Sequence, residues 1–149
     1  MKNCIEKRIE LNAPISRVWR ALTDYREFGQ WFSVNLERPF KPGESTSGFI
    51  TYPGYEHLRM DVIVQKMVPE QLFSFTWHPG AIDPKVDYST EPRTLVEFCL
   101  EKSSKGTILT LTESGFEALP DDRRPDAFRG NDSGWTEQMK NIETYVAQT

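Results

Sequence analysis

Residues 44–114 contain one strand-like segment after another with no helical segment among them, and a single helical pattern follows at 125–146. Apolar and polar residues alternate within each strand-like segment, and turn-forming residues separate the segments, which cover 44–51, 57–67, 72–78, 93–102 and 107–114. Strands that follow one another without a crossover helix pair as antiparallel hairpins. The apolar face of such a sheet needs a cover, which the last helix can provide. The sequence therefore predicts an α+β fold in which a curled antiparallel sheet wraps a long C-terminal helix.

A strand and two short helices are expected before this sheet. Ile5–Leu11 alternates as a half-buried strand, and Pro14 suits the first turn of a helix over 15–22. Thr23 or Asp24 can cap a second short helix. The large apolar residues of that second helix are Tyr25, Phe28, Trp31 and Phe32.

The terminal helix carries a narrow apolar stripe, and a long loop precedes the last two strands. The stripe consists of Trp135, Met139, Ile142 and Val146. Pro125 is a suitable start, whereas Asn131 and Gly134 are poor helix formers that predict a weak point inside the helix. Residues 79–92 contain several breakers and acids, which indicate an exposed loop.

Length and charge limit the kind of protein this can be. The chain has 149 residues, the size of one domain, so we expect residues 1–149 to form a single domain. Acidic residues outnumber basic ones by 22 to 18, and the formal net charge is −4. Binding to nucleic acid or to an anionic membrane needs a basic face, so neither partner is expected. No stretch approaches the roughly 18 apolar residues of a membrane span, so membrane insertion is not expected either.

The cysteines and the first residues indicate a cytoplasmic protein. The N-terminus enters charged alternation directly and lacks the apolar core of a signal peptide. Cys4 and Cys99 are too few for a disulfide scaffold, and both lie in strand-like runs. We therefore expect two free, buried thiols and a cytoplasmic location.

The standard sequence signatures of catalysis and cofactor binding do not appear. His57 and His78 have no partner at metal-ligand spacing, and the cysteines form no Cys-x-x-Cys pair. A Gly-x-Ser-x-Gly elbow and a glycine-rich phosphate loop are both missing. The sequence therefore predicts no metal and no organic cofactor, and it favours a protein without enzymatic activity.

The candidate site is the apolar face that the strands turn toward the terminal helix. We expect a ligand-binding set made of Trp31, Phe32, Met60, Val62, Phe75, Trp77, Phe98, Leu111, Glu113, Trp135 and Met139. Glu113 has the same strand parity as Leu109 and Leu111, so an ideal strand turns its carboxylate inward. The same parity places His57, His78 and Glu97 on the outer face. Two alternatives stay open: the aromatic residues fill a solid core, or the strand ends before Glu113 and leaves it in water.

Five segments, in this order, resemble the SRPBCC superfamily, within it the branch named for homology to the activator of the heat-shock chaperone ATPase. They are Ile15–Thr23, Trp31-Phe32, Phe75–Trp77, Leu109–Phe116, and Gly130–Trp135 with Met139, Ile142 and Tyr145. The resemblance runs from about Ile5 to Val146. It implies a START-like helix-grip fold, a curled antiparallel sheet with two short helices and a long C-terminal helix over an apolar cavity.

The resemblance allows three functions. Relatives bind lipids, hormones or polyketides, so we expect a binding protein for a small hydrophobic or aromatic molecule. The alternatives are a cyclase- or aromatase-like enzyme that uses Glu113, and a stress-related domain that contacts a chaperone or forms a homodimer through an exposed apolar patch on the 25–32 helix. The eukaryotic activators carry a separate chaperone-binding module that this chain lacks, which speaks against ATPase activation.

Overall fold

The protein folds into one seven-stranded antiparallel sheet with three α-helices, in a computed structural model that describes residues 3–83 and 85–148. The strand order is β1-β7-β6-β5-β4-β3-β2. The strands are β1 (Cys4–Leu11), β2 (Val34–Leu36), β3 (Ser45–Ile50), β4 (Arg59–Val68), β5 (Leu72–Trp77), β6 (Thr94–Lys102) and β7 (Thr107–Ser114). The helices are α1 (Ile15–Thr23), α2 (Tyr25–Phe32), the 3₁₀ turn η1 (Phe116–Ala118) and α3 (Arg124–Ala147).

The two short helices end and begin at residues that suit these positions. The Asp24 carboxylate caps α2 by accepting hydrogen bonds from the backbone N–H groups of Arg26 and Glu27, at 2.9 and 3.2 Å. Ser33 ends α2 in a left-handed conformation and directs the chain into β2. The sequence did not reveal β2, because three residues are too few for a periodic pattern.

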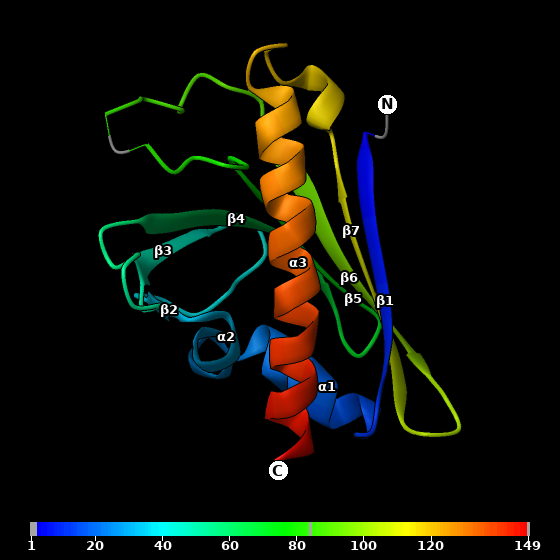
Figure 1. The fold of residues 1–149 in the computed structure, drawn as a ribbon. Coiled ribbons are helices and arrows are strands. Elements are labelled where there is room, and N and C mark those ends of the chain that lie inside the picture. Colours follow the sequence, from blue (N-terminus) through cyan, green and yellow to red (C-terminus); the bar gives the residue numbers. More distant parts are fainter. Residues whose placement is uncertain (1–2, 84, 149) are drawn as a thin grey trace.

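The sheet curls so that α3 lies across its concave face (Figure 1). Alternate residues of β4 to β7 face the helix and are buried beneath it, including Val62, Phe75, Phe98 and Leu111. The stripe Trp135, Met139, Ile142 and Val146 packs onto them. This arrangement confirms the α+β helix-grip architecture expected from the sequence.

The helix α3 is unbroken over its 24 residues, despite Asn131 and Gly134. A Cβ atom built at Gly134, or at Gly130, would meet no other atom within 4 Å, so both glycines lie on the open side of the helix. The buried stripe therefore stabilises the helix enough to offset the low helix propensity of these residues.

The two thiols differ from the expectation, since Cys4 and Cys99 are both exposed and free. Their strand parity is opposite to that of the buried Ile5 and Phe98, so they lie on the outer face of the sheet. Among the described residues, no helix combines the length and the apolar character that a membrane crossing requires.

Candidate functional site

Glu113 lies on the concave face near the end of β7 and is fully buried. It is opposite Val96 of β6 and Ile5 of β1, and its side chain continues the inward row of Leu109 and Leu111. The strand β7 extends to Ser114, so it neither ends nor bulges before the carboxylate. The parity argument from the sequence is therefore confirmed.

Four donors from three elements surround this carboxylate. One oxygen accepts from Trp77 Nε1 of β5 at 2.8 Å and from Thr94 Oγ1 of β6 at 2.6 Å. The other accepts from Trp135 Nε1 of α3 at 2.8 Å, and Asn131 Nδ2 lies 3.0 Å from both oxygens. Asn131 and Trp135 are four residues apart on α3 and so share one face of the helix. Burial of a carboxylate is costly unless hydrogen bonds satisfy it, and this set does so without a cation.

The carboxylate cluster, defined as Glu113, Trp77, Thr94, Asn131 and Trp135, fixes the two indole rings beside each other. The ring centres of Trp77 and Trp135 are 5.6 Å apart, and Phe32 lies 6.2 and 6.0 Å from them. Both indole N–H groups are directed at Glu113. Any surface that these rings offer to a ligand is therefore a ring face or an apolar edge.

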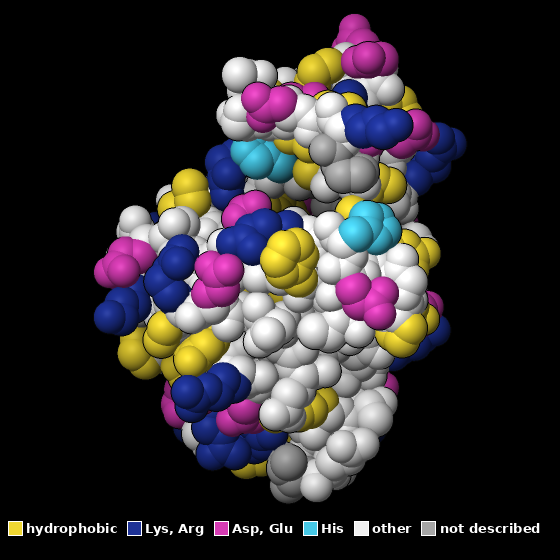
Figure 2. All heavy atoms as spheres, turned by 90° about the vertical axis from the view of Figure 1, so that its left-hand side faces the viewer, with side chains coloured by type: hydrophobic (Ala, Val, Ile, Leu, Met, Phe, Trp, Pro, Cys, Tyr) yellow, Lys and Arg dark blue, Asp and Glu magenta, His cyan; other side chains and the backbone are white. Residues whose placement is uncertain are grey.

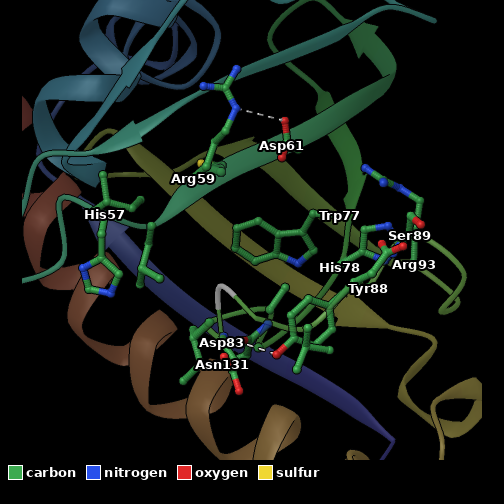
Figure 3. A pocket seen from close by; sticks show the side chains of 18 of the residues that line it. His57, Arg59, Asp61, Trp77, His78, Asp83, Tyr88, Ser89, Arg93 and Asn131 are labelled. Carbon is green, nitrogen blue, oxygen red and sulfur yellow. Dashed lines mark hydrogen bonds and ion pairs between the residues drawn. The ribbon is translucent and has the colours of Figure 1, made fainter.

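A cleft opens beside this cluster, between α3, the loop 79–92 and the end of the β3–β4 hairpin (Figure 2). It has two halves that share lining residues, with volumes of about 670 and 640 Å³. Trp77, at the end of β5, lies in its centre (Figure 3). The hollow is thus at one edge of the helix–sheet interface, where β5 ends and the loop begins.

One half of the cleft has most of the charged side chains and is called the polar half. The polar half adds His57, Arg59, Asp61, His78, Asp83, Asp87, Tyr88, Ser89 and Arg93 (Figure 3). The other half adds Tyr52, Tyr55 and Trp135 together with polar side chains of α3, namely Glu137, Gln138 and Asn141. Large apolar side chains around the two halves are unusually open to solvent for their type: Tyr52, Tyr55, Ile82 and Val86 are between 45% and 66% exposed.

Arg123 attaches both ends of the loop 79–92 to the start of α3. Its guanidinium donates to the backbone oxygens of Pro79 and Gly80 at 2.8 and 3.2 Å, and it pairs with Glu91 at 2.8 Å. It also lies over the ring of Tyr88, 4.7 Å from the ring centre. Gly80 has a φ of +63°, which favours glycine. Both stems of the loop are therefore held against the helix, while Ile82 and Val86 between them project outward.

The sequence over residues 12–147 matches the family model described as activator of Hsp90 ATPase homolog 1-like protein. The chain belongs to this family. The family resemblance expected from the five segments is thereby confirmed. No curated protein in the comparison matches the sequence.

Solved structures show the same fold at low sequence identity. A protein of Mesorhizobium loti is 23% identical, with a TM-score of 0.77, and the match covers 98% of each chain. A protein of Chromobacterium violaceum is 20% identical, with a TM-score of 0.71 and the same coverage. A protein of Arthrobacter aurescens is 16% identical, with a TM-score of 0.79, covering 99% of this chain and 87% of that one. These structural matches establish the fold of this chain.

The expected site residues fall into two groups in this family member. Phe32, Met60, Trp77 and Trp135 line the cleft. The others do not line it and are buried in the interior: Trp31, Val62, Phe75, Phe98, Leu111, Glu113 and Met139. Phe73, Phe75 and Phe98 contact one another and leave a packed interior there.

The expectation for the histidines is wrong, because both line the cleft. The strand β5 ends at Trp77 and β4 begins at Arg59, so strand parity does not extend to His78 or His57. Burial, followed by the nearby Arg93 guanidinium, lowers the pKa of His78, and its Nδ1 is buried without a partner among the described residues. The described residues contain no group of three metal-ligating side chains.

Asn131, Tyr88 and Arg93 are cleft residues that the sequence did not single out. The sequence marks Asn131 only as a poor helix former and as part of the segment 130–135, although it lies one turn before Trp135 on the same helix face. A polar residue at an inward position of an amphipathic helix was the available signal. Tyr88 and Arg93 belong to an irregular segment and its border, where no periodicity indicates direction.

Proposed function

We propose that the protein binds a small hydrophobic or aromatic molecule in the cleft beside Trp77, without a metal or an organic cofactor. The observation that carries the proposal is the state of Trp77: its N–H is bound by buried Glu113, and its ring lines both halves of the cleft. An indole held in this way offers a fixed, flat, apolar surface. The exposed Ile82, Tyr52 and Tyr55 around it would be covered by a ligand.

The size of the cleft suits this function. Small-molecule sites have volumes of about 300–1,000 Å³ and are lined mainly by apolar side chains with a few polar groups. Burial of roughly 300 Å² of a flat ligand would contribute about 7 kcal/mol before the costs of association. Binding in the micromolar range is therefore the expected strength.

A neutral fluorescent dye tests the proposal with two matched variants. Nile red should brighten when mixed with the wild-type protein, and Ile82→Asp should weaken its binding at least fivefold, because a charge replaces an exposed apolar wall of the cleft. Val68→Asp is the control: Val68 is also an exposed apolar residue but lies at the end of β4, outside the cleft. Absence of dye binding, or equal losses in the two variants, would refute binding in this cleft.

The enzymatic alternative rests on Glu113 as general acid or base. The carboxylate is enclosed by its four donors, so a substrate would reach it only after Trp77 or Asn131 moves. Glu113→Gln should abolish turnover if this alternative holds, whereas unchanged turnover would remove it. The enclosure favours a binding role over this one.

The chaperone alternative needs an exposed apolar patch. Phe28 and Trp31 of α2 are buried, so α2 does not provide it, whereas Tyr52 and Tyr55 beside the cleft are open. A contact with a chaperone, or a homodimer through these residues, would bury them. An effect of the purified protein on a chaperone's ATPase rate that Tyr55→Asp abolishes would support this alternative. We propose the cytoplasm as the place of action, because both cysteines are free.

A further inference from the structure

Asn131 is the polar side chain at the centre of the cleft. Six described residues line both halves, and five of them are apolar: Phe32, Ile50, Leu58, Trp77 and Ile82. The sixth is Asn131, on α3 (Figure 3). A ligand that spans the two halves would therefore contact these five apolar side chains and the amide of Asn131.

The amide of Asn131 is oriented by Glu113. Its Nδ2 lies 3.0 Å from both carboxylate oxygens. The reversed orientation would place Oδ1 against these oxygens, which already accept from the Trp77 and Trp135 N–H groups, and acceptors facing acceptors repel. The position of the amide nitrogen is therefore set by the carboxylate cluster.

The oxygen of the same amide is free for a ligand. No described residue donates a hydrogen bond to Asn131 Oδ1, and it is not one of the buried side-chain atoms without a partner. An unpartnered side-chain oxygen that is not buried must be open to solvent, and the residue borders both halves of the cleft. Asn131 thus has a hydrogen-bond acceptor that is open to solvent, on a residue that borders both halves of the cleft.

The surrounding charges do not favour an anionic ligand. The polar half is lined by Asp61, Asp83 and Asp87 against two arginines. One of these, Arg59, is already paired with Glu37 at 3.0 Å. An additional negative charge would find more repulsion than attraction there.

We propose that the ligand is an uncharged, flat, apolar molecule with a hydroxyl group, and that the hydroxyl donates a hydrogen bond to Asn131 Oδ1. This inference rests on the proposed binding function and makes it more specific. Asn131 selects among apolar ligands by the presence of the hydroxyl, and Glu113 acts as a positioning residue that keeps the acceptor directed at it. The oxygen of a hydroxyl also accepts hydrogen bonds. An Nδ2 hydrogen of Asn131 that does not bind Glu113 can therefore lie near it without repulsion.

The test compares 2-naphthol with 2-methoxynaphthalene, which has the same ring system but no donor. Dissociation constants of both are measured with the wild-type protein and with Asn131→Ala. The two compounds differ in hydrophobicity, so the informative quantity is the change in their affinity ratio between the two proteins. We expect Asn131→Ala to reduce the preference for 2-naphthol about fivefold to tenfold, the value of one hydrogen bond, with the ether's affinity changed less than twofold.

Two controls accompany this comparison. Ser133→Ala changes an exposed residue on the same turn of α3 that lies outside the cleft, and it should leave the ratio as in the wild type. Naphthalene-2-carboxylate should bind more weakly than 2-naphthol, and stronger binding of this anion would overturn the proposal. If Asn131→Ala does not fold, a crystal structure of the wild type with 2-naphthol decides: its oxygen should lie within 3.2 Å of Asn131 Oδ1, and any other position refutes the inference.

The outcomes separate this inference from the proposed function. An unchanged affinity ratio in Asn131→Ala would overturn the hydroxyl preference while leaving apolar binding in place. Failure of all the naphthalene compounds and of Nile red to bind would overturn both.

Discussion

At the scale of single residues, Glu113 connects the interior of the protein to the surface of the cleft. Its carboxylate is reached from β5, β6 and α3, and each of its partners is also a wall or a neighbour of the cleft. One buried acceptor therefore fixes the ring of Trp77 and the amide of Asn131. A substitution of Glu113 should therefore change both the free energy of unfolding and the shape of the cleft.

Glu113→Gln should destabilise the protein by about 3 kcal/mol. A carboxamide has one oxygen and one NH₂ group, and since Trp77 and Trp135 donate to different oxygens, either orientation leaves one indole N–H facing a donor. Urea unfolding followed by circular dichroism measures the change. Glu97→Gln, on the outer face of β6, is the control and should cost less than about 1 kcal/mol; equal losses in the two variants would contradict this role of the carboxylate.

The direction of Glu113 could be predicted from the sequence because strand parity is a local property of the chain. The four donors around it could not, since their meeting depends on how α3 docks onto the sheet. The same rule failed for His57 and His78 because it was extended past the strand ends, where side-chain direction no longer alternates. Prediction from strand parity was therefore right for Glu113 inside a regular strand and wrong at the strand borders, whereas the expected burial of Cys4 and Cys99 failed because it followed residue type and not parity.

At the scale of elements, the loop 79–92 is tied to α3 through Arg123. Loss of this side chain should free the loop stems without unfolding the sheet, because its partners are backbone oxygens of the loop, Glu91 and Tyr88. In Arg123→Ala, the amides of residues 85–91 should exchange hydrogen at least tenfold faster, with little change in the strands. Arg129→Ala removes an exposed arginine of the same helix and should have no such effect. Unchanged exchange in Arg123→Ala would show that the loop is held by other contacts.

The continuity of α3 leads to a second prediction for this element. Gly130 is helical and exposed, and an added Cβ meets nothing within 4 Å. Gly130→Ala should therefore stabilise the protein by about 0.5–1 kcal/mol, because alanine has the higher helix propensity and loses less backbone freedom on folding. A thermal melt measures the shift, and a lower melting temperature would contradict it.

At the scale of the whole molecule, the architecture could be predicted but the location of the cleft could not. Strand order, hairpins and a terminal helix follow from periodicity along the chain, and they determine which residues face inward. Whether inward residues meet one another or leave space depends on side-chain packing between distant elements. Phe73, Phe75 and Phe98 pack against one another on the concave face and leave no cleft there among the described residues. The cleft lies instead beside the irregular loop 79–92 that follows β5.

The stability of the whole molecule should also depend on His78. Burial lowers the pKa of this imidazole in the folded protein, and the Arg93 guanidinium lowers it further against the opposing charge of Glu91. In the unfolded chain its pKa is near the ordinary value of about 6.5. Below that pH, His78 is therefore protonated to a greater extent in the unfolded state than in the folded state. The stability that His78 contributes is present above about pH 6.5 and is lost as the pH falls through the lower, folded pKa.

Replacement of His78 by Gln should therefore flatten the decline in stability between about pH 7 and pH 5. Urea unfolding at half-unit steps of pH measures the slope for the wild type and the variant. The protein has one other histidine, His57, which is exposed, so His57→Gln should retain the wild-type slope. A slope that is unchanged in His78→Gln, or flattened equally in His57→Gln, would show that the acid sensitivity arises elsewhere. Because His78 lines the cleft, a ligand that covers it should make the decline steeper, as the ligand further disfavours a buried positive charge.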